Sequence, residues 1–260
     1  MTESSSLWDA ELAAVDFETT GLSPDRGDRA IEVAVVRGRY GHVPQAWSTL
    51  LHPERPVGAT EIHGITDEML SGQPRFVEVA PTLSRLLGGA ILVAHNARFD
   101  LAFLDMECAR AGLTAPEVPV IDTLGLSRRV LALPSHRLSA VCEHLGIGRG
   151  RAHRALDDAE ATWEMAWQLL DRADPERRLT VEDAERLCRR PNTEELKVVL
   201  DALLAAALRH EPITIDYRSS DAQATRRAIT VQRVLGSRVE AFCHLRGEDR
   251  VFRMDRISLV

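Results

Sequence analysis

The sequence VDFETTGL, residues 15–22, follows an apolar run that begins at Leu12 and is typical of the end of a buried strand. It carries two carboxylates, Asp16 and Glu18. Residues two apart in a strand point to the same face, so we expect both carboxylates to converge on one spot. Carboxylates that close repel each other, and a divalent cation removes the repulsion because hard cations prefer carboxylate oxygens. An edge strand with acids on its solvent face would show the same short pattern.

Length and composition describe a globular protein of one large or two smaller domains. The chain has 260 residues, of which 45% are hydrophobic and 27% are charged. No apolar run reaches the length that spans a bilayer, and the N-terminus, MTESSSLWDAEL, is acidic and polar. The four cysteines are scattered without CxxC spacing, which is typical of reduced thiols. We therefore expect no membrane partner and a cytoplasmic location.

Charge is unevenly distributed along the chain. The net charge is −7, yet residues 205–260 contain ten arginines against seven acids, which gives this segment +3 and the rest −10. An acidic body argues against a large surface that coats DNA non-specifically. The C-terminal fifth is a basic module attached to it.

The hydrophobic pattern predicts an α/β fold with a mixed sheet. Residues 12–17, 30–36 and 45–51 have strand patterns separated by turn residues, which indicates an antiparallel meander. Residues 60–71 are predicted as a loop with one short helix. Beyond them, helices and strands alternate, with helices over 76–87, 100–111, 138–145 and 154–171 and short strands at 90–94 and 118–121.

A change of pattern after about residue 175 predicts a second domain. The segment DRADPERR is typical of an exposed joint, and two helices are expected over 180–189 and 193–209. From residue 213 onward the chain has short β-rich segments at 213–218, 226–234, 238–245 and 250–257. The predicted boundaries are 8–175 for the first domain, 176–204 for a helical linker and 205–260 for the C-terminal domain.

A third acid, Asp100, lies in HNARFDLAFL (95–104), where a helix leaves a buried strand. On that helix it shares a stripe with Phe103, Leu104 and Cys108, so its side chain is predicted to point inward. A carboxylate at the head of an apolar stripe is costly unless something compensates its charge. A role as a helix cap is the alternative, because acids favour the first turn.

The segment HRALDDAEA (153–161) offers a fourth acid and a histidine. Helical spacing places Asp157 on a polar face and Asp158 on the packed face, so Asp158 is the inward acid. His153 is well off that stripe and would reach the same site only from the preceding loop, with a solvent-exposed loop histidine as the alternative. Four inward acids and a histidine are what metal-assisted hydrolysis of a phosphodiester requires, with imidazole taking a proton from the attacking water.

The segments VDFETTGL, HNARFDLAFL and HRALDDA resemble the three motifs of the DEDDh family of 3′–5′ exonucleases, which includes the proofreading subunit of bacterial DNA polymerase III. They occur in the same order, and the resemblance covers about residues 10–172. It implies a ribonuclease H-like mixed sheet flanked by helices, and two divalent cations, Mg²⁺ or Mn²⁺. By the same resemblance, the metal ligands are Asp16, Glu18, Asp100 and Asp158, and the general base is His153.

The segment IHGIT (62–66) is similar to the part of that family that contacts the terminal nucleotide. By this resemblance the 3′ end would be bordered by Thr20, Leu22, His63, Ile65 and Asn96. Core positions for Leu22 and Ile65, and a turn position for Asn96, are the alternatives.

Residues 205–260 resemble a WYL domain, a small Sm-like β-barrel, through IDYR (215–218), AFCHLRGEDR (241–250) and VFRMDRI (251–257). The Trp-Tyr-Leu triad that names the family is Ser237-Arg238-Val239 here, which puts any function tied to the triad in doubt. Members of the family sense ligands or bind nucleic acid. A basic groove with aromatic stacking is predicted from Tyr217, His244, Arg246, Arg250, Arg253 and Arg256, and solvated pairs with Asp249 and Asp255 are the alternative.

Together these features predict a cation-dependent 3′–5′ exonuclease that releases nucleoside 5′-monophosphates from single-stranded nucleic acid, DNA being favoured over RNA. The sequence does not separate DNA from RNA, because that choice depends on how the site treats the 2′-hydroxyl. One alternative is a regulatory protein that senses nucleotides or nucleic acid and keeps a vestigial exonuclease scaffold. The other is a polymerase-bound proofreading subunit, for which no polymerase-docking tail is evident.

Overall fold

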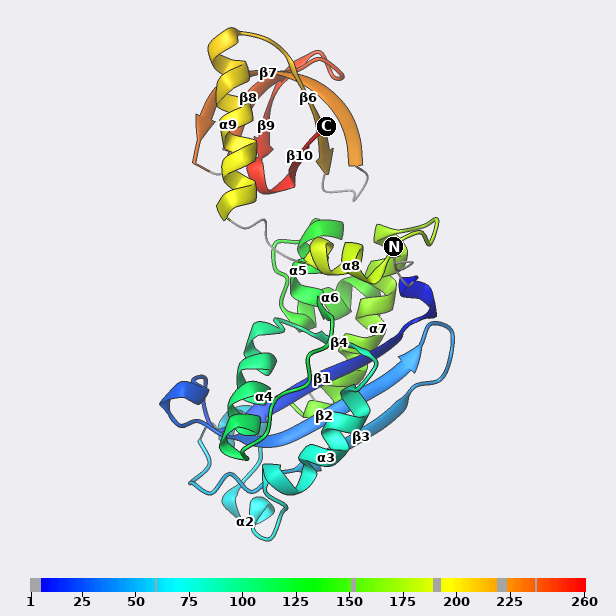
Figure 1. The fold of residues 1–260 in the computed structure, drawn as a ribbon, viewed down its shortest axis with the longest axis vertical. Helices are drawn as coiled ribbons and strands as arrows, with labels where there is room; N and C mark the ends of the chain where they lie inside the picture. The colour runs from blue at the N-terminus through cyan, green and yellow to red at the C-terminus, as the bar shows by residue number, and fades with distance from the viewer. Residues whose placement is uncertain (1–5, 59, 151–152, 189–192, 219–223, 237) are drawn as a thin grey trace. The chain divides into compact units, whose positions relative to one another are not determined.

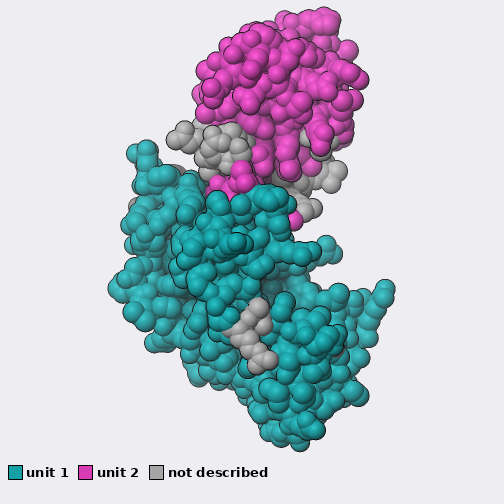
Figure 2. All heavy atoms as spheres, turned by 180° about the vertical axis from the view of Figure 1, so that it is seen from behind, with its two compact units in different colours: residues 1–127, 133–188 teal, residues 128–132, 189–260 magenta. Residues whose placement is uncertain are grey.

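The computed structural model describes residues 6–58, 60–150, 153–188, 193–218, 224–236 and 238–260. The chain forms two compact units (Figure 2). The first comprises residues 1–127 and 133–188, and the second comprises 128–132 and 189–260.

The first unit is built on a five-stranded mixed sheet (Figure 1). Its strands are β1 (Glu11–Thr19), β2 (Ala30–Arg39), β3 (Gln45–Leu50), β4 (Ile91–Ala94) and β5 (Val120–Asp122), in the order β3-β2-β1-β4-β5. The first three strands pair antiparallel, whereas β4 pairs parallel with both β1 and β5. The predicted meander and mixed sheet are confirmed.

Helices cover both faces of this sheet. The core of one face joins Val15 and Phe17 of β1 to Leu83 of α3 (Phe76–Leu87) and Leu104 of α4 (Arg98–Arg110). The long helix α7 (Ala155–Ala173) packs against β1 and β2 and passes behind the sheet in Figure 1, on the side away from α3. Because side chains alternate along a strand, Asp16 and Glu18 share a face with the residues of β1 that α7 covers.

Shorter elements connect these layers. They are α1 (Thr60–His63), α2 (Asp67–Leu70), α5 (Thr123–Val130), α6 (Leu138–Leu145), α8 (Val181–Cys188) and the 3₁₀ turns η1 (Leu7–Asp9) and η2 (Pro24–Arg26). The predicted single short helix within 60–71 is two helices. The sequence patterns did not predict α5, because Gly125 and Ser127 are poor helix formers in its interior.

The second unit consists of α9 (Thr193–Arg209) packed on an antiparallel sheet. The strands are β6 (Ile213–Arg218), β7 (Ala224–Leu235), β8 (Arg238–Cys243), β9 (Glu248–Arg253) and β10 (Ile257–Leu259), in the order β10-β6-β7-β8-β9. Its core joins Leu203 of α9 to Ile215, Val231 and Phe252. The predicted Sm-like β-barrel is not confirmed: β10 pairs with β6 after the 3₁₀ turn η3 (Met254–Arg256), and among the described residues the sheet stays open between its edge strands β9 and β10.

The segment 176–204, predicted as a helical linker, is divided between the units. Helix α8 belongs to the first unit, and α9 contributes to the core of the second. Among the described residues, no helix is both long enough and apolar enough to cross a membrane. All four cysteines are buried.

Candidate active site

The five residues predicted to be catalytic line one cavity of about 440 Å³. They come from three places in the fold: Asp16 and Glu18 from β1, Asp100 from the first turn of α4, and His153 and Asp158 from the loop before α7 and its first turn. The structure therefore brings together side chains that are separated by more than a hundred residues in the sequence.

Asp100 is tied directly to the first strand. Its carboxylate Oδ1 accepts a hydrogen bond from the backbone N–H of Phe17, at 3.2 Å, and the residue is only 5% exposed. Phe17 lies between Asp16 and Glu18, so this bond holds the start of α4 against the strand that carries the other two acids. The predicted inward orientation of Asp100 is observed.

Asp158 and His153 are joined through the backbone. Oδ2 of Asp158 accepts from the backbone N–H of His153 at 3.2 Å, while Oδ1 accepts from the guanidinium of Arg149. His153 is exposed and has φ +60°, a left-handed conformation that is costly for a residue other than glycine. It precedes α7, as the helical spacing predicted, and Asp158 rather than Asp157 lines the cavity.

One group of side chains has the geometry of a metal site. Glu18, His153 and Asp158 each offer a ligand atom, and these atoms all lie within 4.8 Å of one another. Carboxylate oxygens are the donors that Mg²⁺ and Mn²⁺ prefer, and an imidazole nitrogen also suits first-row metals. Asp16 and Asp100 border the same cavity, so the donor set fits a hard divalent cation.

The electrostatics of the cavity favour a bound cation. Burial raises the pKa of Asp16 well above its ordinary value, and the neighbouring charges, chiefly those of Asp100 and Asp158, raise it further. Burial also raises the pKa of Asp100 to about 8, although the hydrogen bond from Phe17 lowers it. The pKa of Glu18 rises to about 7, first through burial and then through Asp158. These shifts show that the negative charges are poorly compensated by the protein itself.

A further acid, Glu32, supports the site from the neighbouring strand. It is 3% exposed and lies opposite Glu18 in the β1–β2 register. Arg154 donates to Glu32 through Nε at 3.1 Å and Nη2 at 2.7 Å, and the N–H of Ala155 donates at 3.0 Å. This contact fixes the first turn of α7 on the sheet. The patterns above did not indicate Glu32, although a charge inside the apolar run AIEVAVV was a usable signal.

Two of the five residues predicted to border the terminal nucleotide line the cavity. Leu22 is 82% exposed at the end of the β1 turn, and Asn96 is exposed with φ +74°. The N–H of Asn96 donates to Oδ1 of Asp122 at 2.9 Å, which holds this turn in place. Asn96 is thus both a turn residue and a cavity residue.

The other three residues predicted to border the nucleotide have their side chains in the protein interior. The hydroxyl of Thr20 accepts from the N–H of Arg29 at 3.0 Å. His63 is buried, with Nδ1 accepting from the N–H of Ile65 at 3.0 Å and Nε2 lying 2.9 Å from the carbonyl of Gly58. Ile65 packs in a small core cluster. The cavity is lined instead by side chains that the sequence patterns did not indicate: Thr19, Ile62, His95 and Phe99.

Two of the residues predicted to form a groove in the second unit are in contact, because the N–H of Arg253 donates to the hydroxyl of Tyr217 at 3.4 Å. Tyr217 contacts Phe252 edge-on, and the guanidinium of Arg227 lies 5.4 Å from its ring centroid. Arg253 pairs with Asp255 at 2.7 Å, which matches the alternative of a solvated pair. His244 lies 2.8 Å from the hydroxyl of Thr230, and Arg246 and Arg250 are exposed and Arg256 is half-buried. Ser237 of the triad position lies outside the described residues. The basic groove stays a prediction.

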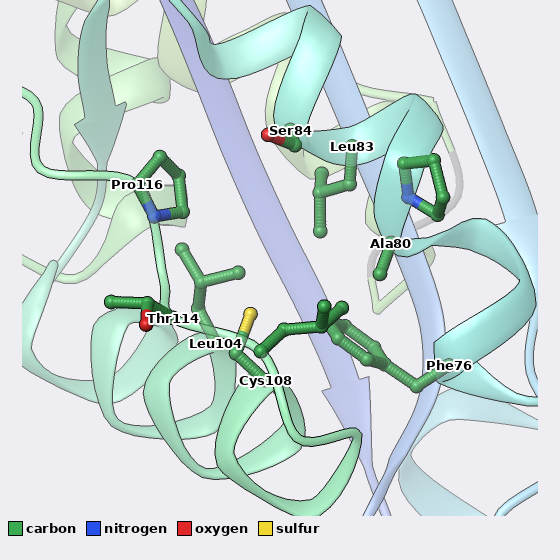
Figure 3. Close-up of a pocket in the computed structure, with 10 residues that line it drawn as sticks. Phe76, Ala80, Leu83, Ser84, Leu104, Cys108, Thr114 and Pro116 are labelled. Carbon is green, nitrogen blue, oxygen red and sulfur yellow. The ribbon is translucent and has the colours of Figure 1, made fainter.

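An apolar cavity of about 190 Å³ lies between α3 and α4 (Figure 3). Phe76 and Leu83 of α3 and Leu104 and Cys108 of α4 point into it. No carboxylate of the part of the chain that the structure describes lines it, and burial raises the pKa of the Cys108 thiol. Its described lining offers no oxygen ligand of the carboxylate type and no activated nucleophile, and the lining shares no residue with the acidic cavity.

The mixed sheet and its carboxylate cluster define a nuclease fold of the ribonuclease H-like class. Residues 13–166 match the Exonuclease family RNase_T, and residues 198–260 match the WYL domain. The chain therefore belongs to the RNase_T exonuclease family and carries a C-terminal WYL domain, which confirms both resemblances.

Two curated relatives match about three fifths of this chain. The chain is 41% identical over 164 residues to a PolC-type DNA polymerase III of Thermotoga maritima, and 34% identical over 164 residues to the 3′-5′ exonuclease DinG of Bacillus subtilis. Each match covers 62% of this chain, but only 12% of the Thermotoga protein and 18% of the Bacillus protein.

Solved structures share the fold. Exonuclease X in complex with 5′ overhanging duplex DNA is 26% identical, with a TM-score of 0.55, and the match covers 68% of this chain and 99% of that one. The nuclease domain of 3′hExo, a DEDDh family member bound to rAMP, is 21% identical with a TM-score of 0.56, covering 64% and 94%. E. coli exonuclease I in complex with single-stranded DNA is 16% identical with a TM-score of 0.59, covering 97% and 65%.

Proposed function

We propose that the chain is a divalent-cation-dependent 3′–5′ exonuclease that releases nucleoside 5′-monophosphates from the 3′ end of single-stranded nucleic acid, with DNA favoured. The observation that carries this proposal is the convergence of Asp16, Glu18, Asp100, His153 and Asp158 on one cavity. The family and the solved structures support the reaction class, because exonuclease X, 3′hExo and exonuclease I have the same fold.

The four carboxylates would hold two cations, Mg²⁺ or Mn²⁺. Bound cations would neutralise phosphate charge and lower the pKa of the attacking water. The raised pKa values of Asp16, Glu18 and Asp100 support this assignment, since the same side chains become favourably ionised once positive charge is present. No arginine or lysine among the described residues lines this cavity, so the protein supplies little positive charge there. Bound cations would therefore have to offset the negative charge of the substrate phosphate.

His153 would act as the general base. It lines the cavity from an exposed loop, and imidazole groups take up protons near neutral pH. Its backbone bond to Asp158 and its left-handed φ fix where the ring emerges. Because the ring is exposed, a proton taken from water can be passed on to solvent.

The terminal nucleotide would lie on the apolar part of the cavity wall. Leu22, Ile62 and Phe99 line it, and apolar and aromatic side chains hold bases without strong sequence preference. Exonuclease X with duplex DNA and exonuclease I with single-stranded DNA support a nucleic-acid end as the substrate. The WYL domain would assist nucleic-acid or ligand binding through its exposed arginines, Arg246 among them.

The test compares Asp16→Ala and His153→Ala with a matched control, Glu160→Ala, which changes an exposed acid on α7. Each full-length protein is incubated with 5′-labelled single-stranded DNA or RNA, with Mg²⁺ or with EDTA. We expect the control to degrade DNA from the 3′ end in Mg²⁺, and both site variants to lose nearly all activity. Activity that survives EDTA, or survives either substitution in a folded protein, would contradict the proposal.

A further inference from the structure

The residue that follows the candidate general base is anchored to the sheet. Arg154 lies between His153 and α7, and its guanidinium donates to both carboxylate oxygens of Glu32, to Oε1 through Nη2 at 2.7 Å and to Oε2 through Nε at 3.1 Å. A guanidinium that meets a carboxylate through two N–H groups is fixed in orientation as well as in distance. Glu32 lies on β2 opposite Glu18, so Arg154 is held beside the strand that carries two of the four acids.

Glu32 acts on the site through this contact and not as a further metal ligand. It is only 3% exposed and does not belong to the described lining of the acidic cavity. Its oxygens accept from Arg154 and from the N–H of Ala155, the latter at 3.0 Å. Partners of this kind compensate the charge of a buried carboxylate. Glu32 therefore holds the two consecutive residues that come directly after His153.

The position of the His153 ring depends on this stretch of backbone. The ring is exposed, and no hydrogen bond joins it to another residue that the structure describes. His153 has φ +60°, a conformation that a residue other than glycine keeps only where surrounding contacts enforce it. These contacts include the bond from its N–H to Asp158 at 3.2 Å and the hold of Glu32 on the next two residues. Backbone contacts thus keep the ring near Glu18 and Asp158.

We propose that Arg154 is a positioning residue for the general base. Its two-pronged bond to Glu32 fixes the backbone after His153 and so holds the imidazole over the acidic cavity, within reach of the attacking water. This inference rests on the proposed function, because the role of His153 as general base is part of that function. Lysine at position 154 keeps the positive charge but cannot form the fork, so Arg154→Lys tests orientation separately from charge.

The first measurement is a double-mutant cycle on the full chain. Single-turnover rates on 5′-labelled single-stranded DNA with Mg²⁺ are compared for the wild type, Arg154→Lys, His153→Ala and the double variant. A slightly misplaced base loses rate, so we expect Arg154→Lys to lower the wild-type rate about 10-fold. In the His153→Ala background it should change the residual rate by less than about 2-fold, because the ring that it positions is gone. The control Arg172→Lys, at an exposed position on α7, should change neither rate.

The second measurement does not depend on hydrolysis. The full chain is labelled with ¹³C in its histidine rings and studied by NMR in EDTA, where the His153 signal is identified by its loss in His153→Ala. We expect Arg154→Lys, and independently Glu32→Gln, to move this signal toward the position of an unstructured histidine. Arg172→Lys should leave it in place. Urea denaturation establishes that each variant is folded, and calorimetry with Mn²⁺ should show unchanged metal affinity for Arg154→Lys.

Each outcome decides the proposal. An equal loss of rate in both backgrounds would mean that Arg154 supports the fold in general and does not act through His153. An unmoved His153 signal in a folded variant would mean that Arg154 does not hold the ring, and weaker Mn²⁺ binding would assign its effect to the carboxylates. Any of these results overturns the inference. If the wild type hydrolyses no strand, the proposed function fails, while the His153 signal still decides whether Arg154 positions the ring.

Discussion

The guanidinium of Arg149 donates a hydrogen bond to Oδ1 of Asp158, so a protein cation pairs with one of the four carboxylates of the candidate metal site. Asp16, Glu18 and Asp100 form no ion pair with any residue that the structure describes. Oδ2 of Asp158 is already bonded to the N–H of His153. A metal ion that binds Asp158 must therefore share this carboxylate with Arg149 or displace it.

Removal of Arg149 should strengthen metal binding. The pair is partly exposed, so competition from Arg149 is expected to cost about 1 kcal/mol, and Arg149→Ala should tighten Mn²⁺ binding about 5-fold. Calorimetric titration of the full chain with Mn²⁺ measures this, with Arg172→Ala as the control. Unchanged or weaker Mn²⁺ binding would mean that Arg149 positions Asp158 rather than competing for it.

The contact between Glu32 and Arg154 should contribute more to stability than surface ion pairs do. Glu32→Ala removes the acceptor of the Ala155 N–H and leaves the Arg154 guanidinium without its partner, so we expect a loss of about 2 to 3 kcal/mol in the free energy of unfolding. Urea denaturation measures it. The control Glu182→Ala breaks an exposed pair with Arg186 and should leave the unfolding midpoint unchanged. Similar midpoints for the two variants would contradict the assigned role of Glu32.

The four carboxylates and the histidine that line the candidate site could be predicted from the sequence because their orientation depends on local periodicity. The two-residue spacing of Asp16 and Glu18 fixes a common face on any strand, and helical spacing separates Asp158 from Asp157. The position of His153 before α7 followed from the same geometry. Each of these inferences needs only the type of element on which the residue lies.

Which side chains line the cavity, and how the strands of the second sheet pair, depend on tertiary packing. The spacing of apolar residues in the sequence carries no information on that packing. In IHGIT, Ile62 lines the cavity, whereas the resemblance implied Ile65, three positions later. The ring nitrogens of His63 contact the carbonyl of Gly58 and the N–H of Ile65, and these contacts hold the loop against the protein interior. The arrangement of the second sheet depends on which strand its last strand pairs with. After the η3 turn, β10 pairs with β6, which leaves β9 and β10 as the two edges.

Replacing each of the two isoleucines of that loop by alanine should change a different property of the protein. Ile62 is 54% exposed at the cavity, so Ile62→Ala should raise KM for single-stranded DNA and leave the unfolding free energy nearly unchanged. Ile65 is fully buried, so Ile65→Ala should cost about 2 to 5 kcal/mol of stability. Steady-state kinetics and urea denaturation of both variants separate the effects. A larger KM change for Ile65→Ala, in a protein that is still folded, would restore Ile65 as the nucleotide contact.

Stability of the metal-free protein should fall as pH rises through neutrality. In the unfolded chain Glu18 and Asp100 ionise near their ordinary values of 4.5 and 3.8, whereas in the folded protein their pKa values are about 7 and about 8. Between about pH 4 and pH 8 the folded state thus binds more protons than the unfolded state, which lowers the free energy of unfolding as pH increases. If Mg²⁺ binds the ionised carboxylates as proposed, it should raise the thermal midpoint more at about pH 8 than at about pH 5. Thermal unfolding at both pH values, with MgCl₂ or with EDTA, measures this, and Asp16→Asn should reduce the Mg²⁺-dependent increase. An equal increase at both pH values, or a larger one at the lower pH, would show that these carboxylates do not bind the cation.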